Sequence, residues 1–166
     1  MAELRENKLV EAIGLGVNEN QVCLDALEIG FWDVFLLAGR YTLLEQTALD
    51  ELFPACVKSG TSIICGGPFN SGILVGREMW NYAKAPQTVI EKANSLSKIA
   101  DEFNIPLAAA ALQFPQANEL VSSVIPGPRS KDELLEILKW QKVKIPTEFW
   151  KSLKERKLLR ADAPTP

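Results

Sequence analysis

The sequence contains no histidine. Because imidazole is the commonest general acid–base and metal ligand in proteins, its absence excludes Ser-His-Asp and Cys-His catalysis within these residues. The cysteines are also few, and Cys23, Cys56 and Cys65 lie among apolar neighbours without forming a C-x-x-C pair. We expect three reduced, buried thiols, and the sequence indicates no metal site.

Long apolar runs and an excess of positive charge are lacking as well. No stretch approaches the roughly 20 apolar residues that span a bilayer, and residues 1–14 lack the features of a secretory signal peptide. The formal net charge is −3, so no positive field attracts nucleic acid or an anionic membrane. We therefore expect a cytoplasmic protein that binds neither nucleic acid nor a membrane.

Hydrophobic residues are plentiful, at 47% of 166 residues, which predicts a packed single domain over residues 1–166. Four apolar segments are interpreted as strands, and helical periodicity follows each of them: 9–17, 31–39, 61–67 and 120–126. This alternation predicts an α/β fold with a parallel sheet of about four strands. The nearly continuous apolar runs indicate that both faces of the sheet are covered.

Smaller features of the chain complete this expectation. Helices are predicted over the segments 20–30, 48–60, 88–104, 107–118, 130–140 and 147–159. Residues 80–87 are interpreted as an irregular loop, and residues 159–166, which are rich in proline and alanine, as a flexible tail. Tyr41 is expected to be structural, because a single tyrosine at a strand end usually packs its ring and finds a hydrogen bond.

Unusual residues gather where the predicted strands end, at 18–19, 40–41, 66–72 and 127–130. In parallel sheets the functional loops lie at these carboxyl ends. In the stretch VIPGPRS, Gly127 permits a tight turn, Ser130 is placed to cap a helix, and Arg129 offers a guanidinium to an anion. A capped helix beside a solvated arginine is the alternative. The stretch GGPFNSG allows close backbone approach to a ligand, and a surface loop is its alternative.

Several motifs together resemble the second half of the aldo-keto reductases over essentially the whole chain: VEAIGLGVNEN, FWDVFLLAGRYTLLEQ, CGGPFNSGILVG, LAAAALQFP and VIPGPRS. They are most similar to the branch of aldose 1-dehydrogenases, of the D-threo-aldose or L-fucose type, and pyridoxal 4-dehydrogenase. The resemblance implies the second half of a TIM barrel, which remains incomplete as a barrel because a full one needs about 250 residues. It also implies a bound NADP or NAD in an extended pose.

The resemblance assigns cofactor contacts to three segments. The pyrophosphate loop corresponds to Gly67, Pro68, Phe69, Asn70, Ser71 and Gly72. The loop around the adenosine corresponds to Gly127, Pro128, Arg129 and Ser130, with Glu133 near the adenine. Asn18 and Glu19 correspond to the residues that hold the nicotinamide carboxamide. The sequence departs from the usual family pattern at three positions: Ala38, Gly66 and Ile137.

The family's catalytic Asp, Tyr, Lys and His belong to its first half, so the resemblance implies no catalytic residue in this chain. It implies the cofactor-binding half of an NAD(P)-dependent oxidoreductase that converts cyclic hemiacetals to lactones and is inactive alone. The expected partner is an N-terminal barrel half, or a second copy paired through exposed sheet edges. The alternatives are a non-catalytic nucleotide- or anion-binding α/β module and a degenerate remnant without a ligand. Both NAD and NADP stay open, because Arg129 favours a 2′-phosphate while Asp132 and Glu133 oppose one.

Overall fold

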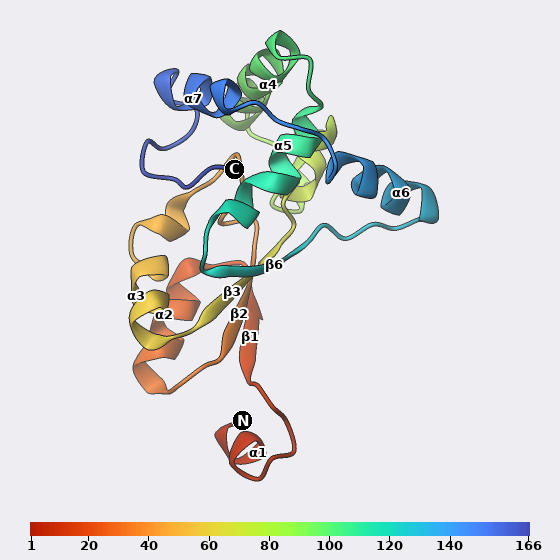
Figure 1. Cartoon of the computed structure of the whole chain (residues 1–166). Coiled ribbons are helices and arrows are strands. Elements are labelled where there is room, and N and C mark those ends of the chain that lie inside the picture. Colours follow the sequence, from red (N-terminus) through yellow and green to blue (C-terminus); the bar gives the residue numbers. More distant parts are fainter.

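A computed structural model describes residues 1–166. Its centre is one parallel sheet of four strands in the order β1-β2-β3-β6, formed by β1 (Gly14–Val17), β2 (Val34–Ala38), β3 (Ser62–Gly66) and β6 (Val121–Ile125). The sheet is open, so β1 and β6 form its two edges (Figure 1). The prediction of an α/β fold with about four parallel strands that do not close a barrel is confirmed.

Helices follow the strands in the predicted order. They are α2 (Asn20–Ile29), α3 (Leu52–Ser59), α4 (Gln87–Glu102), α5 (Leu107–Gln113), α6 (Lys131–Trp140) and α7 (Thr147–Glu155). Shorter elements are α1 (Ala2–Glu6) and three 3₁₀ helices: η1 (Thr47–Leu49), η2 (Asn70–Val75) and η3 (Phe114–Ala117). In Figure 1, α2 and α3 lie together against one side of the sheet, whereas α6 extends away from it. None of the helices combines the length and the hydrophobicity that a membrane-spanning helix requires.

Only one face of the sheet is covered, so the expectation of two covered faces is wrong within these residues. Side chains alternate between the faces of a strand, and Phe35, Leu37 and Ile63 are buried in the same hydrophobic cluster as residues of α2 and α3. Leu36 and Ile64, on the opposite side, are only partly buried. The apolar strand pattern is therefore correct, but this chain supplies helices to one face alone.

Two local predictions also differ from the structure. The first predicted strand, 9–17, is a strand only over Gly14–Val17, and residues 9–12 are exposed coil. Residues 80–87 are not irregular, because β4 (Met79–Trp80) and β5 (Ala83–Lys84) pair as an antiparallel hairpin. Its two turn residues, Asn81 and Tyr82, both have positive φ, as the tight two-residue hairpin turn requires.

The C-terminal segment 159–166, expected to be a flexible tail, is packed against the body of the molecule. Leu159 and Ala163 are buried in the main hydrophobic cluster. The guanidinium of Arg160 forms ion pairs with Asp50 and Asp162. Two buried apolar side chains and the ion pairs of Arg160 therefore hold residues 159–166 in place, although the composition of this segment predicted a flexible tail.

The main core is a single cluster of 33 buried residues that joins the helix-covered face of the sheet to α4, α5 and α7. Tyr41 lies within it, between the rings of Phe53 and Phe114 at centroid distances of 4.7 and 5.1 Å. Burial raises the pKa of Tyr41 to about 12, so its hydroxyl stays protonated at neutral pH. The prediction of a structural role for Tyr41 is confirmed.

The three cysteines are free and buried, as predicted. Burial raises the pKa of the Cys23 thiol to about 11 and that of the Cys56 and Cys65 thiols to about 12. The thiolate is the reactive form of cysteine, so these side chains act as small apolar core residues.

Candidate functional site

Two glycine-containing loops leave neighbouring strands at the same edge of the sheet. Gly66 at the end of β3 is in register with Ile125 at the end of β6. The next amide, that of Gly67, donates a hydrogen bond of 3.0 Å to the carbonyl of Ile125. Residues 67–72 and 126–130 therefore begin side by side, although almost 60 residues separate them in the sequence.

The first loop has an unusual backbone. Gly67, Asn70, Ser71 and Gly72 all have positive φ, with values of 58°, 47°, 58° and 104°. Such angles are uncommon and strained for residues other than glycine, and they persist only where the surrounding structure holds them. A Cβ atom on Gly72 would come within 2.7 Å of the Cδ of Arg77, so the side chain of Arg77 lies directly over this glycine.

Both loops line one cavity of about 1370 Å³, whose other walls come from α4, α5, α6 and residues 76–79. The predicted site residues on its lining are Gly67, Phe69, Ser71, Gly72, Gly127, Pro128, Arg129 and Glu133. Typical small-molecule pockets measure about 300–1,000 Å³. The cavity is therefore large enough for an elongated ligand.

Glu133 joins the two sides of this cavity electrostatically. Its carboxylate accepts a hydrogen bond of 2.7 Å from the backbone amide of Arg129 and pairs with the guanidinium groups of Arg77 at 3.0 Å and Arg129 at 3.4 Å. These contacts, the Arg129 amide foremost, hold the pKa of Glu133 below its usual range. Arg77 was missed by the sequence analysis, because nothing in its local pattern links it to a residue 56 positions later.

An aromatic contact joins the first loop to α6. Phe69, in the first loop, meets Trp140 of α6 edge-on, with ring centroids 5.6 Å apart. Both side chains line the cavity, together with Ile137 on the preceding turn of α6. Trp140 is thus a natural fluorescent reporter of events at the site.

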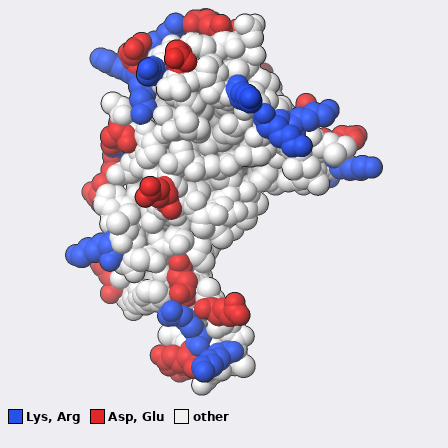
Figure 2. Space-filling view, in the orientation of Figure 1, with Lys and Arg blue, Asp and Glu red and all other residues white.

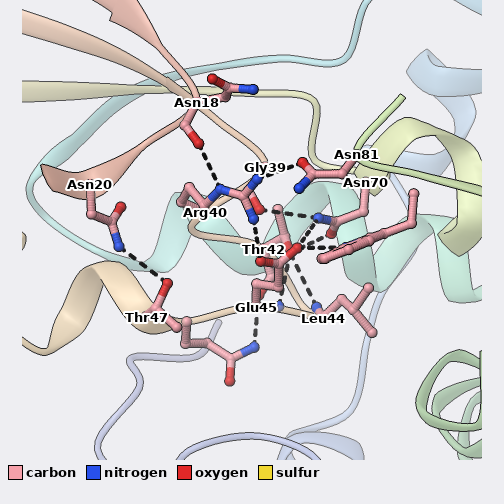
Figure 3. A network of polar contacts seen from close by, with 12 residues as sticks. Asn18, Asn20, Gly39, Arg40, Thr42, Leu44, Glu45, Thr47, Asn70 and Asn81 are labelled. Atoms are coloured by element: carbon pink, nitrogen blue, oxygen red, sulfur yellow. Dashed lines mark hydrogen bonds and ion pairs between the residues drawn. The ribbon is translucent and has the colours of Figure 1, made fainter. Parts of the chain in front are cut away.

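Asn70 is the exception among the predicted polar contacts of the first loop. Its side chain is 4% exposed and does not line the cavity. Instead, Nδ2 donates to the carbonyl of Gly39 at 3.1 Å and to Glu45 at 2.9 Å, while Oδ1 accepts from the hydroxyl of Thr42 (Figure 3). The side chain of Asn70 therefore stabilises the left-handed backbone at the start of η2. Its amide group is already hydrogen-bonded within the protein and does not face the cavity.

Glu45 is the centre of this polar network. Besides Asn70, it accepts hydrogen bonds from Arg40 at 2.6 Å and from the indole of Trp80 at 2.8 Å. Arg40 also donates to the carbonyl of Asn18 at 2.7 Å and to the side chain of Asn81 (Figure 3). The network ties the ends of β1 and β2, the first loop and the β4–β5 hairpin into one unit. The sequence placed Arg40 at a strand end but gave no sign of Glu45 as its partner.

The remaining predicted residues do not line the cavity: Asn18, Glu19, Pro68, which is buried, and Ser130. Asn18 and Glu19 are exposed at the end of β1, two strands away from β3 in the sheet. Ser130 caps α6, since its hydroxyl accepts a hydrogen bond of 3.1 Å from the Glu133 amide, as predicted. Asn20 was not predicted, yet its side-chain oxygen is buried without a hydrogen-bond partner, which is rare for a polar atom.

The cavity offers hydrogen-bond donors to an anionic group and apolar surface to flat rings, alongside the carboxylates of Glu78, Glu133 and Glu136. Arg77 and Arg129 supply guanidinium groups, which pair with phosphate oxygens in a bidentate way. Glycines at 67, 72 and 127 let a ligand approach the backbone closely. Phe69 and Trp140 add apolar surface for a ring.

Comparisons with known proteins give a consistent result. The chain matches the Aldo/keto reductase family over residues 1–157. It is 43% identical over 163 residues to pyridoxal 4-dehydrogenase of Microbacterium luteolum, covering 96% of this chain and 48% of that protein. It is 33% identical over 171 residues to D-threo-aldose 1-dehydrogenase of Pseudomonas sp, covering 100% and 51%. The chain thus spans about half the length of these curated relatives.

Solved structures show the same fold. The apo form of aldo-keto reductase AKR11C1 from Bacillus halodurans superposes with a TM-score of 0.72 at 20% identity, covering 98% of this chain and 56% of that one. The holo form of the same protein gives the same TM-score and identity. The fold of this chain therefore corresponds to a little over half of that structure.

Proposed function

The chain belongs to the aldo/keto reductase family, and on this premise we propose that it carries the dinucleotide-binding part of an NAD(P)-dependent oxidoreductase. One observation carries the proposal: the glycine loop after β3 and the arginine-bearing loop after β6 line the same large cavity. Neither stretch is specific alone, but their meeting at the carboxyl ends of adjacent parallel strands is the usual position of a functional site in such sheets.

The order of the strands supports an extended cofactor pose. We assign the adenosine end to Gly127, Pro128, Arg129, Ser130 and Glu133, beyond β6, and the pyrophosphate to residues 67–72, beyond β3. The nicotinamide end then points toward Asn18 and Glu19, beyond β1. The strand order β1-β2-β3-β6 arranges these three groups in sequence along one edge of the sheet.

Asn70 has a different role in this proposal from the one its sequence motif suggested. Because its amide is committed to Gly39, Glu45 and Thr42, it positions the pyrophosphate loop rather than contacting the ligand. Ser130 likewise acts through the helix cap that orients Arg129 and Glu133. The contacts left for a diphosphate are the guanidinium groups and the exposed backbone of the glycine loop.

For the complete enzyme we propose oxidation of a cyclic hemiacetal, such as an aldose or pyridoxal in its cyclic form, to a lactone. When bound, the nicotinamide accepts the hydride. The hydroxyl proton requires a general base, and because the resemblance places the family's catalytic residues in its first half, we assign that group to residues outside these 166. What these residues contribute is binding and orientation of the dinucleotide.

Further strands are proposed to complete the sheet. Strands β1 and β6 each have an unpaired edge. In addition, α6 exposes 44–50% of three leucine side chains, those of Leu134, Leu135 and Leu138. In Figure 2 the middle of the visible surface carries few charged side chains apart from one acidic patch, and most charges lie over α1, α6, the helices at the top and the side of α2 and α3. Unpaired edges and uncharged faces of this kind pair with other strands.

Without such a partner, copies of the chain are expected to associate through the same edges. Sedimentation velocity over a hundredfold dilution tests this, and the expected result is a concentration-dependent shift to larger species. A monomer that persists at every concentration would contradict the proposal, because it would show that the open edges need no partner.

Replacing Arg129 with alanine is expected to weaken dinucleotide binding about tenfold or more, since a charge-assisted hydrogen bond contributes about 1.5–3 kcal/mol. Titration of NAD and NADP against tryptophan fluorescence measures this change. The control is Arg156→Ala, which removes a guanidinium paired with Glu102, and neither of these residues lines the cavity. Absence of binding by the unaltered chain, or equal losses in both variants, would rule out the assigned site.

A further inference from the structure

We propose that the tip of the β4–β5 hairpin belongs to the dinucleotide site, with Tyr82 as a ligand contact and Asn81 as the positioning residue that holds Tyr82 in place. The inference rests on the proposed dinucleotide function. It assigns a binding role to a segment that the sequence pattern predicted to be an irregular loop. Tyr82 and Met79 of this hairpin line the same cavity as the glycine loop at residues 67–72.

Two hydrogen bonds fix the tip to different parts of the molecule. The side-chain oxygen of Asn81 accepts from the guanidinium of Arg40, and the amide of Tyr82 donates to the hydroxyl of Ser71 at 3.1 Å. Arg40 is itself immobilised by its ion pair with Glu45 at 2.6 Å, and its side chain is only 15% exposed (Figure 3). The tip is therefore held by a largely buried charge on one side and by the glycine loop on the other.

The hairpin needs these contacts to keep one conformation. Each of its strands has two residues, and an isolated two-stranded hairpin is only marginally stable in water. Asn81 and Tyr82 have φ angles of 51° and 63°, a left-handed backbone that costs free energy for residues with side chains. The hydrogen bond from the Trp80 indole anchors β4, so the turn itself depends on its bonds to Arg40 and Ser71.

The ring of Tyr82 has the properties of a ligand contact. It lines the cavity, yet 76% of the residue is exposed, and Met79 of the same hairpin is 41% exposed. Large apolar side chains that stand open at the wall of a cavity gain free energy when a ligand covers them. The backbone amide of Tyr82 is already bonded to Ser71, which leaves the ring and its hydroxyl to meet the ligand.

The position of the tip selects the nicotinamide half of the dinucleotide. Arg40 follows β2 and also donates to the carbonyl of Asn18, which follows β1, at 2.7 Å. In the proposed pose the nicotinamide points toward the ends of these strands, whereas the adenosine lies beyond β6, at the other edge of the sheet. We therefore assign Tyr82 to the nicotinamide half and expect the adenosine end to bind independently of it.

The test compares the dissociation constants of NAD and of ADP, which has the adenosine and the diphosphate but no nicotinamide. Asn81→Gly removes the oxygen that accepts from Arg40 and keeps a residue suited to the positive φ of this turn. Tyr82→Gly removes the ring and leaves Asn-Gly, the pair that this kind of turn prefers. The matched control is Asn104→Gly, at an exposed residue with a φ of 54° that does not line the cavity. Isothermal titration calorimetry measures binding, and urea denaturation verifies that each variant keeps its fold.

Asn81→Gly and Tyr82→Gly are each expected to weaken NAD binding about fivefold or more and to change ADP binding by less than about twofold. Asn104→Gly is expected to alter neither. Unchanged NAD binding in either hairpin variant, equal losses for NAD and ADP, or a comparable loss of NAD binding in Asn104→Gly would overturn the inference and leave the proposed function standing. Failure of the unaltered chain to bind NAD would overturn the proposed function, and this inference with it.

Discussion

Replacing Glu45 with alanine is expected to lower the free energy of unfolding by about 3 kcal/mol, because removing one member of a largely buried ion pair leaves the other charge uncompensated. The side chains of Arg40 and Glu45 are only 15% and 17% exposed. The substitution also deprives the indole of Trp80 and the amide of Asn70 of an acceptor. Urea denaturation followed by circular dichroism measures the loss.

The control for this prediction is Glu119→Ala, an exposed carboxylate without an ion pair, for which we expect a change within about 0.5 kcal/mol. Glu45→Gln is expected to lie between the two, since an amide oxygen still accepts from Trp80 but no longer neutralises Arg40. A loss for Glu45→Ala as small as that for Glu119→Ala would show that the network does not support the fold.

The second large effect is expected at Gly72. Its φ of +104° is strained for any residue with a side chain, and an added Cβ would lie 2.7 Å from the Cδ of Arg77. Gly72→Ala is therefore expected to cost about 1–3 kcal/mol of stability. It is also expected to weaken dinucleotide binding at least about tenfold, because Arg77 must leave its position beside Glu133.

Gly30→Ala is the matched control for this substitution. Gly30 has an extended φ of 174°, and a Cβ atom there would meet nothing within 4 Å. We expect it to change stability by no more than about 0.5 kcal/mol and to leave binding unaltered. If Gly72→Ala behaved like Gly30→Ala in both measurements, the strained backbone of the first loop would have no role in holding a ligand.

The sequence predicted those features that depend on local patterns. Apolar runs located all four strands, and Ser130 and Gly60 marked helix ends that the structure confirms. The convergence of residues 67–72 and 127–130 was also predictable, because parallel strands bring their carboxyl ends to one edge. The family resemblance sharpened this expectation into a specific ligand.

Features that depend on distant partners could not be read from local patterns. Glu45 accepts a hydrogen bond from Trp80, which lies 35 positions later in the sequence, and Arg77 pairs with Glu133, which lies 56 positions later. The polar, glycine-rich motif around Asn70 predicted a ligand contact, but the side chain is instead hydrogen-bonded to Gly39 and Glu45 in the buried network. The packed segment 159–166 was missed for the same reason, since its order comes from the core it contacts.

We propose that the loops at residues 67–72 and 127–130 bind the same dinucleotide molecule. Amide NMR spectra of the ¹⁵N-labelled chain, recorded while NAD is added, test this most directly. The expected result is that the amides of both loops shift together and saturate at a single dissociation constant, while those of residues 1–12 stay in place. Shifts confined to one loop, or found only elsewhere in the molecule, would contradict the claim.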